Sequence, residues 1–324
     1  MKSYRIPHSD LEVSRIAYGC MDLGGSWDAR PLTKALRSRA AELVAAAIEQ
    51  GITLFDHADI YTHGKSETVF GDVLRELPGA RQRIVLQSKC GIRLQDDPRR
   101  GNPPRYDFSH LHIVRSVEGS LRRLGTDHLD ILLLHRPDPL VEPDEVAQAF
   151  AQLKQSGKVR HFGVSNHTAA QVALLQRHVD QPLVINQVEL NLLHSHLIDE
   201  GVSANQEGDR YAAAAGTLDY CRLHEVMIQA WSPVAKGKLI HPPARTDRRT
   251  RSTAALVAKL ARAKGTTKEA VALAWLLRHP AGIQPIVGTT KRERLIASCL
   301  ADGVELSREE WYALFAAGRG APVP

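Results

Sequence analysis

Cysteine is scarce in this sequence, with four residues in a chain of 324. Cys20, Cys90, Cys221 and Cys299 are far apart and form no Cys-x-x-Cys pair. Neither a zinc site nor a disulfide framework is therefore indicated, and this usage fits a reducing compartment. The first residues, Met-Lys-Ser-Tyr-Arg, lack the apolar core of a signal peptide. We predict a cytoplasmic protein.

Long apolar runs are missing too. No stretch approaches the roughly 18 apolar residues that a membrane-spanning helix requires, so no membrane partner is predicted. The net charge of +6 is mildly basic, but no long Lys/Arg run with interleaved aromatic residues occurs, which argues against nucleic-acid binding. Arginines 245, 248, 249 and 251 could attract a phosphate, although a solvated basic loop is the favoured reading. The oligomeric state is not indicated.

The sequence does contain a repeating pattern of short apolar strands and amphipathic helices. Residues 3–20 alternate around His8-Ser9-Asp10 and predict a small hairpin that leads into the first strand. The predicted strands cover residues 15–20, 53–58, 84–89, 129–135, 159–165, 183–189, 227–232 and 286–288. The predicted helices cover residues 38–50, 66–77, 109–124, 143–156, 168–178, 217–225, two stretches within 252–278, 291–301 and an added 307–317.

Eight strands, each followed by helix and without a domain linker, favour an α/β protein that folds as a (β/α)8 TIM barrel. We expect one domain over residues 1–324, with an N-terminal β-hairpin and an extra C-terminal helix. A doubly wound sheet is the alternative, but residues 19–25 do not match its Gly-x-Gly-x-x-Gly turn. The long connections 90–108, 190–216 and 233–251 all follow strands, so they should lie on the active face. The first, which is rich in proline and arginine, is expected to be semi-ordered.

Ionisable side chains follow three successive predicted strands. Asp56 and Tyr61 follow the second strand, Lys89 ends the third, and His135 ends the fourth. Because the carboxyl ends of parallel strands meet at one mouth of a barrel, these four side chains should converge there. Taken alone, Asp56 and Tyr61 are more typical of a turn that enters a helix. The prediction therefore rests on the occurrence of ionisable side chains at the ends of three successive strands.

The four side chains are suited to acid–base chemistry. A lysine ammonium about 4 Å from a phenol favours the phenolate by about 4 kcal/mol at an effective dielectric of 20, so we predict a lowered pKa for Tyr61. Asp56 would hold Lys89 in place and keep it charged. His135 could hydrogen-bond the substrate oxygen and orient it. Such a unit can protonate a carbonyl oxygen while hydride arrives at carbon.

Seven motifs, in one order along the chain, carry a resemblance to a known family. They read Phe-Asp56-x-Ala-x-x-Tyr61-x-x-Gly-x-Ser-Glu, Ser-Lys89, Leu-Asp-x-x-Leu-Leu-His135, Gly-Lys-Val-Arg-x-Phe-Gly-Val-Ser165-Asn166, Asn-Gln187-Val-Glu-Leu-Asn, Ala-Trp231-Ser232-Pro and Pro-Ile-Val-Gly-Thr-Thr-Lys-Arg-Glu-Arg294. The sequence thus resembles the aldo-keto reductases, most closely a bacterial branch of largely uncharacterised oxidoreductases. The resemblance covers essentially the whole chain, including the hairpin that plugs the barrel bottom in this family.

The resemblance implies a nicotinamide cofactor lying across the barrel mouth. It assigns Tyr61 as the proton donor and His135 as the residue that orients the carbonyl. Lys89 and Asp56 would adjust the pKa of Tyr61. By the same resemblance, Ser165, Asn166 and Gln187 would hold the carboxamide, Trp231 would stack on the nicotinamide, and Ser232 would cover the pyrophosphate.

The segment after the eighth strand bears on the choice of cofactor. Thr289, Thr290, Lys291, Arg292 and Arg294 cluster where a helix begins, with only Glu293 competing. Helix N-termini and nearby cations bind anions, so we predict NADPH over NADH. Two positions depart from the family: position 288 is glycine where many members have a phosphate-binding lysine, and position 298 is serine where many have an asparagine that contacts adenine.

The leading functional hypothesis is an NADPH-dependent reductase of an aldehyde or ketone, with a small-molecule carbonyl substrate and no metal. The alternative is a non-catalytic NADP(H)-binding redox sensor on the same fold, which would have no need to keep all four groups. A phosphate-handling barrel would leave those groups unexplained. The physiological substrate is not predicted. Trp27, His57 and the loops 90–108 and 190–216 are candidates to line its pocket, and His57 has no assigned role.

Overall fold

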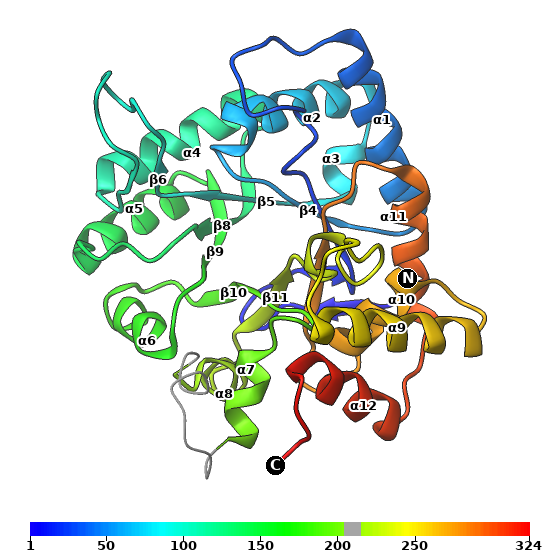
Figure 1. Ribbon diagram of the computed structural model, residues 1–324. Helices are drawn as coiled ribbons and strands as arrows, with labels where there is room; N and C mark the ends of the chain where they lie inside the picture. Colours follow the sequence, from blue (N-terminus) through cyan, green and yellow to red (C-terminus); the bar gives the residue numbers. More distant parts are fainter. Residues whose placement is uncertain (204–214) are drawn as a thin grey trace.

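Eight parallel strands close into a barrel in the computed structural model, which describes residues 1–203 and 215–324 (Figure 1). Around the barrel their order is β10-β11-β12-β3-β4-β5-β8-β9. Their bounds are β3 Ala17–Gly19, β4 Leu54–Asp56, β5 Val85–Cys90, β8 Leu129–Leu134, β9 Val159–Ser165, β10 Leu183–Glu189, β11 Met227–Trp231 and β12 Gln284–Val287. The predicted (β/α)8 barrel is confirmed, because β12 pairs with β3 to complete the ring.

Helices surround the strands in Figure 1. Their bounds are α1 Lys34–Glu49, α2 Lys65–Glu76, α3 Ala80–Arg83, α4 His110–Leu124, α5 Pro143–Gln155, α6 Ala169–His178, α7 His196–Asp199, α8 Thr217–Leu223, α9 Arg248–Ala263, α10 Lys268–Leu277, α11 Arg292–Cys299 and α12 Arg308–Arg319. Helix α4 buries one apolar stripe, with Ile113, Val117 and Leu124 in the main core, whereas α10 is buried on all sides from Ala270 to Leu277. None of the helices in the described ranges combines the length and the apolarity needed to cross a bilayer.

Both chain ends pack on the barrel. Strands β1 (Ser3–Arg5) and β2 (Glu12–Ser14) pair antiparallel, and Ile6 and Val13 share a buried cluster with barrel residues such as Ile131. This hairpin therefore closes the end of the barrel opposite the strand C-termini. The added C-terminal helix is α12, whose Trp311 stacks on Trp275 of α10 with ring centres 5.4 Å apart.

Among the element boundaries that differ from the sequence prediction, two have clear local reasons. Helix α9 begins at Arg248 rather than at 252 because the Asp247 side chain caps it, accepting from the Thr250 amide at 2.7 Å. Strand β12 begins at Gln284 rather than at 286. The sequence pattern places polar Gln284 outside the strand, yet this side chain is fully buried and donates to the Ser14 carbonyl at 2.6 Å.

Strand pairing orders one of the long connections, and side-chain hydrogen bonds hold part of another. Residues 90–108 are not merely semi-ordered, because β6 (Ile92–Arg93) pairs with β7 (Arg105–Tyr106) and Arg93 forms an ion pair with Asp107 at 2.5 Å. The basic stretch 245–251 is not simply a solvated loop either, since Arg249 donates to the carbonyls of Gly318 and Leu193. In connection 190–216, residues 204–214 lie outside the described part of the chain.

Candidate active site

A buried lysine joins the ionisable groups at the barrel mouth. Lys89 Nζ donates to both carboxylate oxygens of Asp56 at 2.7 Å, to the His57 carbonyl at 2.9 Å and to Tyr61 Oη at 3.1 Å. Strands β4 and β5 are neighbours, and their parallel pairing brings these side chains together. The His135 ring lies edge-on to the Tyr61 ring, with centres 5.8 Å apart. The structure thus places all four side chains of the predicted set at one mouth.

Tyr61 is held by a turn whose backbone is strained. The 3-10 turn Tyr61–Gly64 contains Thr62 at φ 49° and His63 at φ 59°, both in the left-handed region that non-glycine residues rarely adopt. Thr62 Oγ1 hydrogen-bonds Ser66 Oγ at 2.9 Å, and Ser66 Oγ donates to the Met21 carbonyl at 2.8 Å. These bonds over-determine the turn and so hold the phenol over Lys89.

A second buried carboxylate ties the helix behind this turn to the lysine strand. Glu67 of α2 is fully buried, accepts from Ser88 Oγ at 2.7 Å and forms an ion pair with Arg123 of α4 at 2.7 Å. Ser88 directly precedes Lys89 on β5. Glu67 therefore fixes the spacing between the Tyr61 turn and the Lys89 strand.

The pKa of Tyr61 differs in direction from the sequence prediction. Burial raises this pKa above its ordinary value of 10.0, and the Lys89 charge opposes the rise without reversing it. The prediction considered the Coulomb attraction alone and omitted the lost hydration of the phenolate. Burial also disfavours the Lys89 ammonium, but the Asp56 and Tyr61 charges outweigh this, so the pKa of Lys89 is raised. Tyr61 is therefore a protonated donor beside a permanent cation.

His135 is a neutral imidazole. Burial, with the charges of Lys89 and Arg136 added, lowers its pKa well below 6.5. Its Nδ1 atom is buried and has no hydrogen-bond partner among the described residues. A neutral ring at this place can orient a carbonyl oxygen without competing for the role of acid.

Asp56 is supported by a layer of four glutamines, of which the sequence analysis singled out only Gln187. Gln87 and Gln187 each donate an amide hydrogen to Asp56 Oδ1, at 2.6 and 3.0 Å. Both also donate to Gln229, which in turn donates to Gln284 at 2.8 Å. Glutamines within apolar strands are the only local signal for this layer, and they do not show that four strands bring them together.

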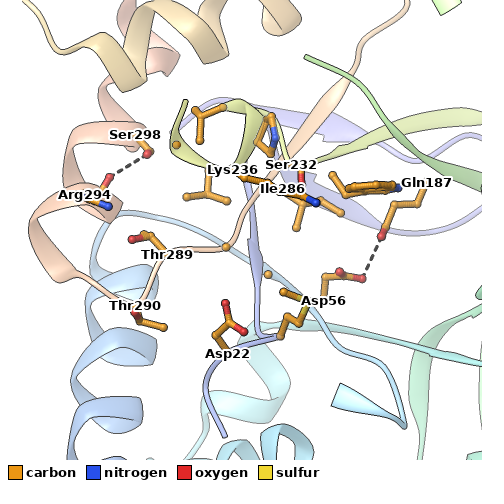
Figure 2. A pocket seen from close by; sticks show the side chains of 18 of the residues that line it. Asp22, Asp56, Gln187, Ser232, Lys236, Ile286, Thr289, Thr290, Arg294 and Ser298 are labelled. Atoms are coloured by element: carbon orange, nitrogen blue, oxygen red, sulfur yellow. Dashed lines mark hydrogen bonds between the residues drawn. The ribbon is translucent and has the colours of Figure 1, made fainter. Parts of the chain in front are cut away.

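One cavity of about 720 Å³ runs from Asp56, Tyr61 and His135 to the start of α11 (Figure 2). In Figure 2, Asp56 and Gln187 lie at one end, and Arg294 and Ser298 lie at the other. Eight residues predicted to bind the cofactor line this cavity: Ser165, Asn166, Gln187, Trp231, Ser232, Thr289, Lys291 and Arg294. Arg292 of the predicted basic cluster does not line it. Asn166 and Ser232 each follow a strand with positive φ, which turns the chain at the cavity wall.

Hydrogen bonds order the end of the cavity beside His135 and Trp231. Asn166 donates to Ser165 Oγ at 2.8 Å and to the His135 carbonyl at 3.2 Å, and its Oδ1 accepts from Trp231 Nε1 at 3.0 Å. The Trp231 ring is therefore fixed in the wall, and Asn166 Oδ1 keeps a second lone pair for a ligand donor.

The opposite end of the cavity, at the start of α11, is basic. Lys291 and Arg294 line this end, and Lys236 also lines the cavity; none of the three forms an ion pair within the described part of the chain. Glu269 also lines the cavity and is a carboxylate that the sequence analysis missed. At Gly288 a Cβ atom would meet only the Gly19 carbonyl oxygen, at 3.9 Å, so the backbone there leaves open space. A wall with an indole at one end and unpaired cations at the other is suited to a nicotinamide dinucleotide, whose phosphates carry negative charge.

Two residues predicted as candidates for the substrate pocket, Trp27 and His57, do not line this cavity. Trp27 stands edge-on beside Tyr61 with ring centres 6.5 Å apart, at the rim of the mouth. His57 is fully buried and packs against Phe70, 4.5 Å between ring centres, with neither ring nitrogen hydrogen-bonded within the described chain. It does not line the cavity. Burial, assisted by the Lys89 charge, lowers the pKa of His57 to about 3.

We expect His57→Leu to flatten the acid side of the stability–pH profile. The unfolded histidine titrates near 6.5 and the folded one near 3, so between these values the unfolded state binds the extra proton. Stability contributed by neutral His57 is therefore lost as pH falls, by about 1.4 kcal/mol per pH unit. Urea unfolding at several pH values measures the slope. The exposed His241→Gln is the control, and equal slopes for wild type and His57→Leu would contradict the prediction.

Comparison with known proteins agrees with this geometry. A family model described as Aldo/keto reductase family matches residues 15–318. The chain is 39% identical to the uncharacterized oxidoreductase YcsN of Bacillus subtilis, covering 97% of both proteins. It is 36% identical to a 6-dehydroglucose reductase of Agrobacterium fabrum, covering 98% of this chain and 99% of that protein. The solved structure of a glycerol dehydrogenase from Gluconobacter oxydans superposes with a TM-score of 0.82 at 25% identity, over 99% and 97% of the two chains.

Proposed function

Because this chain belongs to the aldo/keto reductase family and is an NAD(P)H-dependent oxidoreductase, we propose that it reduces an aldehyde or ketone to an alcohol with NADPH. The observation that carries the proposal is the Lys89 ammonium, which contacts both Asp56 and the Tyr61 hydroxyl at the cavity wall.

We further propose that residues 1–324 form a single domain. We also propose a cytoplasmic location, which the unpaired cysteines support.

The side chains would act as an acid and its supports. A bound nicotinamide supplies hydride to the carbonyl carbon. Tyr61 gives its proton to the carbonyl oxygen, and the Lys89 charge stabilises the phenolate left behind. His135, being neutral, donates a hydrogen bond that aims the carbonyl oxygen at the Tyr61 hydroxyl. Asp56 acts through Lys89, which it holds in place.

The cofactor would be held by residues at both ends of the cavity. Ser165, Asn166 and Gln187 are placed to bind the carboxamide, because Asn166 and its neighbours already form an ordered polar wall. Trp231 would stack on the nicotinamide, since its ring is anchored through Nε1. Ser232 and the backbone after it would cover the pyrophosphate.

NADPH consumption with a panel of aldehydes and ketones tests the proposed function. The panel should include short aliphatic aldehydes, benzaldehydes and hexose-derived aldehydes, because a relative acts on 6-dehydroglucose. Turnover of any of these carbonyls, with alcohol formed in equal amount to NADPH consumed, is the expected result. Tight NADPH binding without turnover of any carbonyl would instead support a redox sensor.

The preference for NADPH should depend on Lys291 and Arg294. We expect Lys291→Gln and Arg294→Gln each to raise the Kd for NADPH by a factor of about 10 to 100, the size of one lost charge-assisted contact, and to leave the Kd for NADH nearly unchanged. Fluorescence titration with both cofactors measures this. Arg292→Gln is the matched control, because Arg292 pairs with Glu49 and does not line the cavity. Equal affinity of the wild type for NADH and NADPH would refute the preference.

A further inference from the structure

A second cavity, of about 430 Å³, adjoins the first. The two cavities share Arg136, Asn166 and Trp231, so they meet at the nicotinamide end of the site. The second cavity is lined further by His194 and His196, from the connection after β10, and by Glu189. The cofactor residues and the acid–base groups use the first cavity, so the second has room for the part of a substrate beyond its carbonyl group.

Arg136 is a half-buried cation at the junction of the two cavities. It directly follows His135, and its guanidinium carbon lies 5.4 Å from the centre of the Trp231 ring. Within the described ranges its guanidinium has no ion pair. The nearest carboxylate along the chain, Asp138, is committed elsewhere, because it accepts from the amides of Phe108 and Leu140 at 3.0 and 2.9 Å.

Two other arginines packed against the barrel have carboxylate partners. Arg81 pairs with Asp130 at 2.9 Å, and Arg123 pairs with Glu67 at 2.7 Å. A partly desolvated charge without a counter-ion is costly, and an arginine fork is the side chain best shaped to bind a carboxylate with two parallel hydrogen bonds. An unpaired guanidinium that faces both cavities is therefore a specific feature of this mouth.

The rest of the second cavity suits an anion as well. The His194 and His196 rings stand edge-to-face with centres 4.0 Å apart, and burial lowers the pKa of both, so they present neutral N–H donors. Glu189 is the one carboxylate among the described residues that line this cavity. It forms no ion pair with Arg136 in the described chain.

We propose that Arg136 pairs with a carboxylate on the substrate, and that the preferred substrates are short aldehydes with a carboxylate at the opposite end of the chain. The inference rests on the proposed function, because it places the reacting carbonyl between Tyr61 and His135. Since Arg136 is the next residue after His135, only a short spacer separates the aldehyde from the carboxylate. The second cavity holds the carboxylate end.

The test compares 4-oxobutanoate with butanal, which has the same chain length and no carboxylate. For the wild type we expect kcat/KM to be at least about tenfold higher for 4-oxobutanoate, the effect of one charge-assisted contact. Arg136→Met, which keeps an unbranched apolar stem and removes the charge, should bring the ratio near one, mainly by raising KM for 4-oxobutanoate. Arg136→Lys should retain part of the preference, because a point charge replaces the fork. The exposed Arg115→Met is the control.

A binding measurement makes the test independent of turnover. Succinate, which keeps one carboxylate and replaces the aldehyde with a second, should bind to the NADP⁺-saturated wild type in calorimetry and not to Arg136→Met. Equal kcat/KM for the two aldehydes, or a ratio that Arg136→Met leaves unchanged, would overturn the inference while butanal turnover still supports the proposed function. A higher KM for NADPH with an unchanged aldehyde ratio would assign Arg136 to the cofactor. Absence of turnover with every carbonyl refutes the proposed function, and absence of succinate binding then refutes the role of Arg136 too.

Discussion

Tyr61→Phe is expected to lower kcat for aldehyde reduction by about 10² to 10⁴-fold, the usual contribution of a general acid. The substitution removes the hydroxyl that Lys89 contacts at 3.1 Å and keeps the ring that packs against His135 and Trp27. The aldehyde should still bind and the fold should persist, so the loss should appear in kcat rather than in stability. Steady-state NADPH consumption, with thermal unfolding as a check, measures both.

A matched control separates loss of the acid from loss of a phenol. Tyr106 is 41% exposed and lies on β7, away from both cavities, so Tyr106→Phe should leave kcat unchanged. Cofactor affinity should also be equal in wild type and Tyr61→Phe. A kcat within threefold of wild type in Tyr61→Phe would mean that another group or water delivers the proton.

Asp56→Asn is expected to destabilise the protein by about 3–5 kcal/mol, because it leaves the Lys89 ammonium buried without its counter-charge. Lys89 is 1% exposed, so water cannot replace the lost carboxylate. Lys89→Met alone should cost a similar amount, since Asp56 then becomes the unpaired buried charge. The double variant Asp56→Asn/Lys89→Met removes both charges and should recover most of the lost stability while remaining inactive.

Urea unfolding of the four proteins, at a pH where the wild type is stable, gives the coupling between the two charges. The half-exposed pair Glu118 and Lys158, 2.8 Å apart, is the control, because neutralising it should change the free energy of unfolding far less. A double variant less stable than either single variant would show that Asp56 and Lys89 contribute separately rather than as a pair.

Much of the site could be predicted because its signals are local. Strands β9 and β10 have the bounds that the apolar pattern predicts, residues 159–165 and 183–189. Asp56, Lys89 and His135 each lie at or beside the end of such a strand, and parallel strands in a barrel share one mouth. Given the fold, their convergence follows from chain order alone.

The remaining features depend on what surrounds each residue. The glutamines at 87, 229 and 284 read as ordinary polar residues until four strands bring them into one buried layer beneath Asp56. Arg136 looks like a surface arginine in the sequence, and only the packing of Trp231 and the commitment of Asp138 leave its charge unpaired at the junction of two cavities.

The sequence by itself determined the barrel, the family and the set of ionisable groups at its mouth, because periodicity and residue order are properties of the chain. Only the tertiary structure decided the direction of the Tyr61 pKa shift, the support beneath Asp56 and the position of the unpaired guanidinium. The physical reason is that desolvation and pairing depend on which atoms surround a charge, and those atoms come from strands and helices far apart in the sequence.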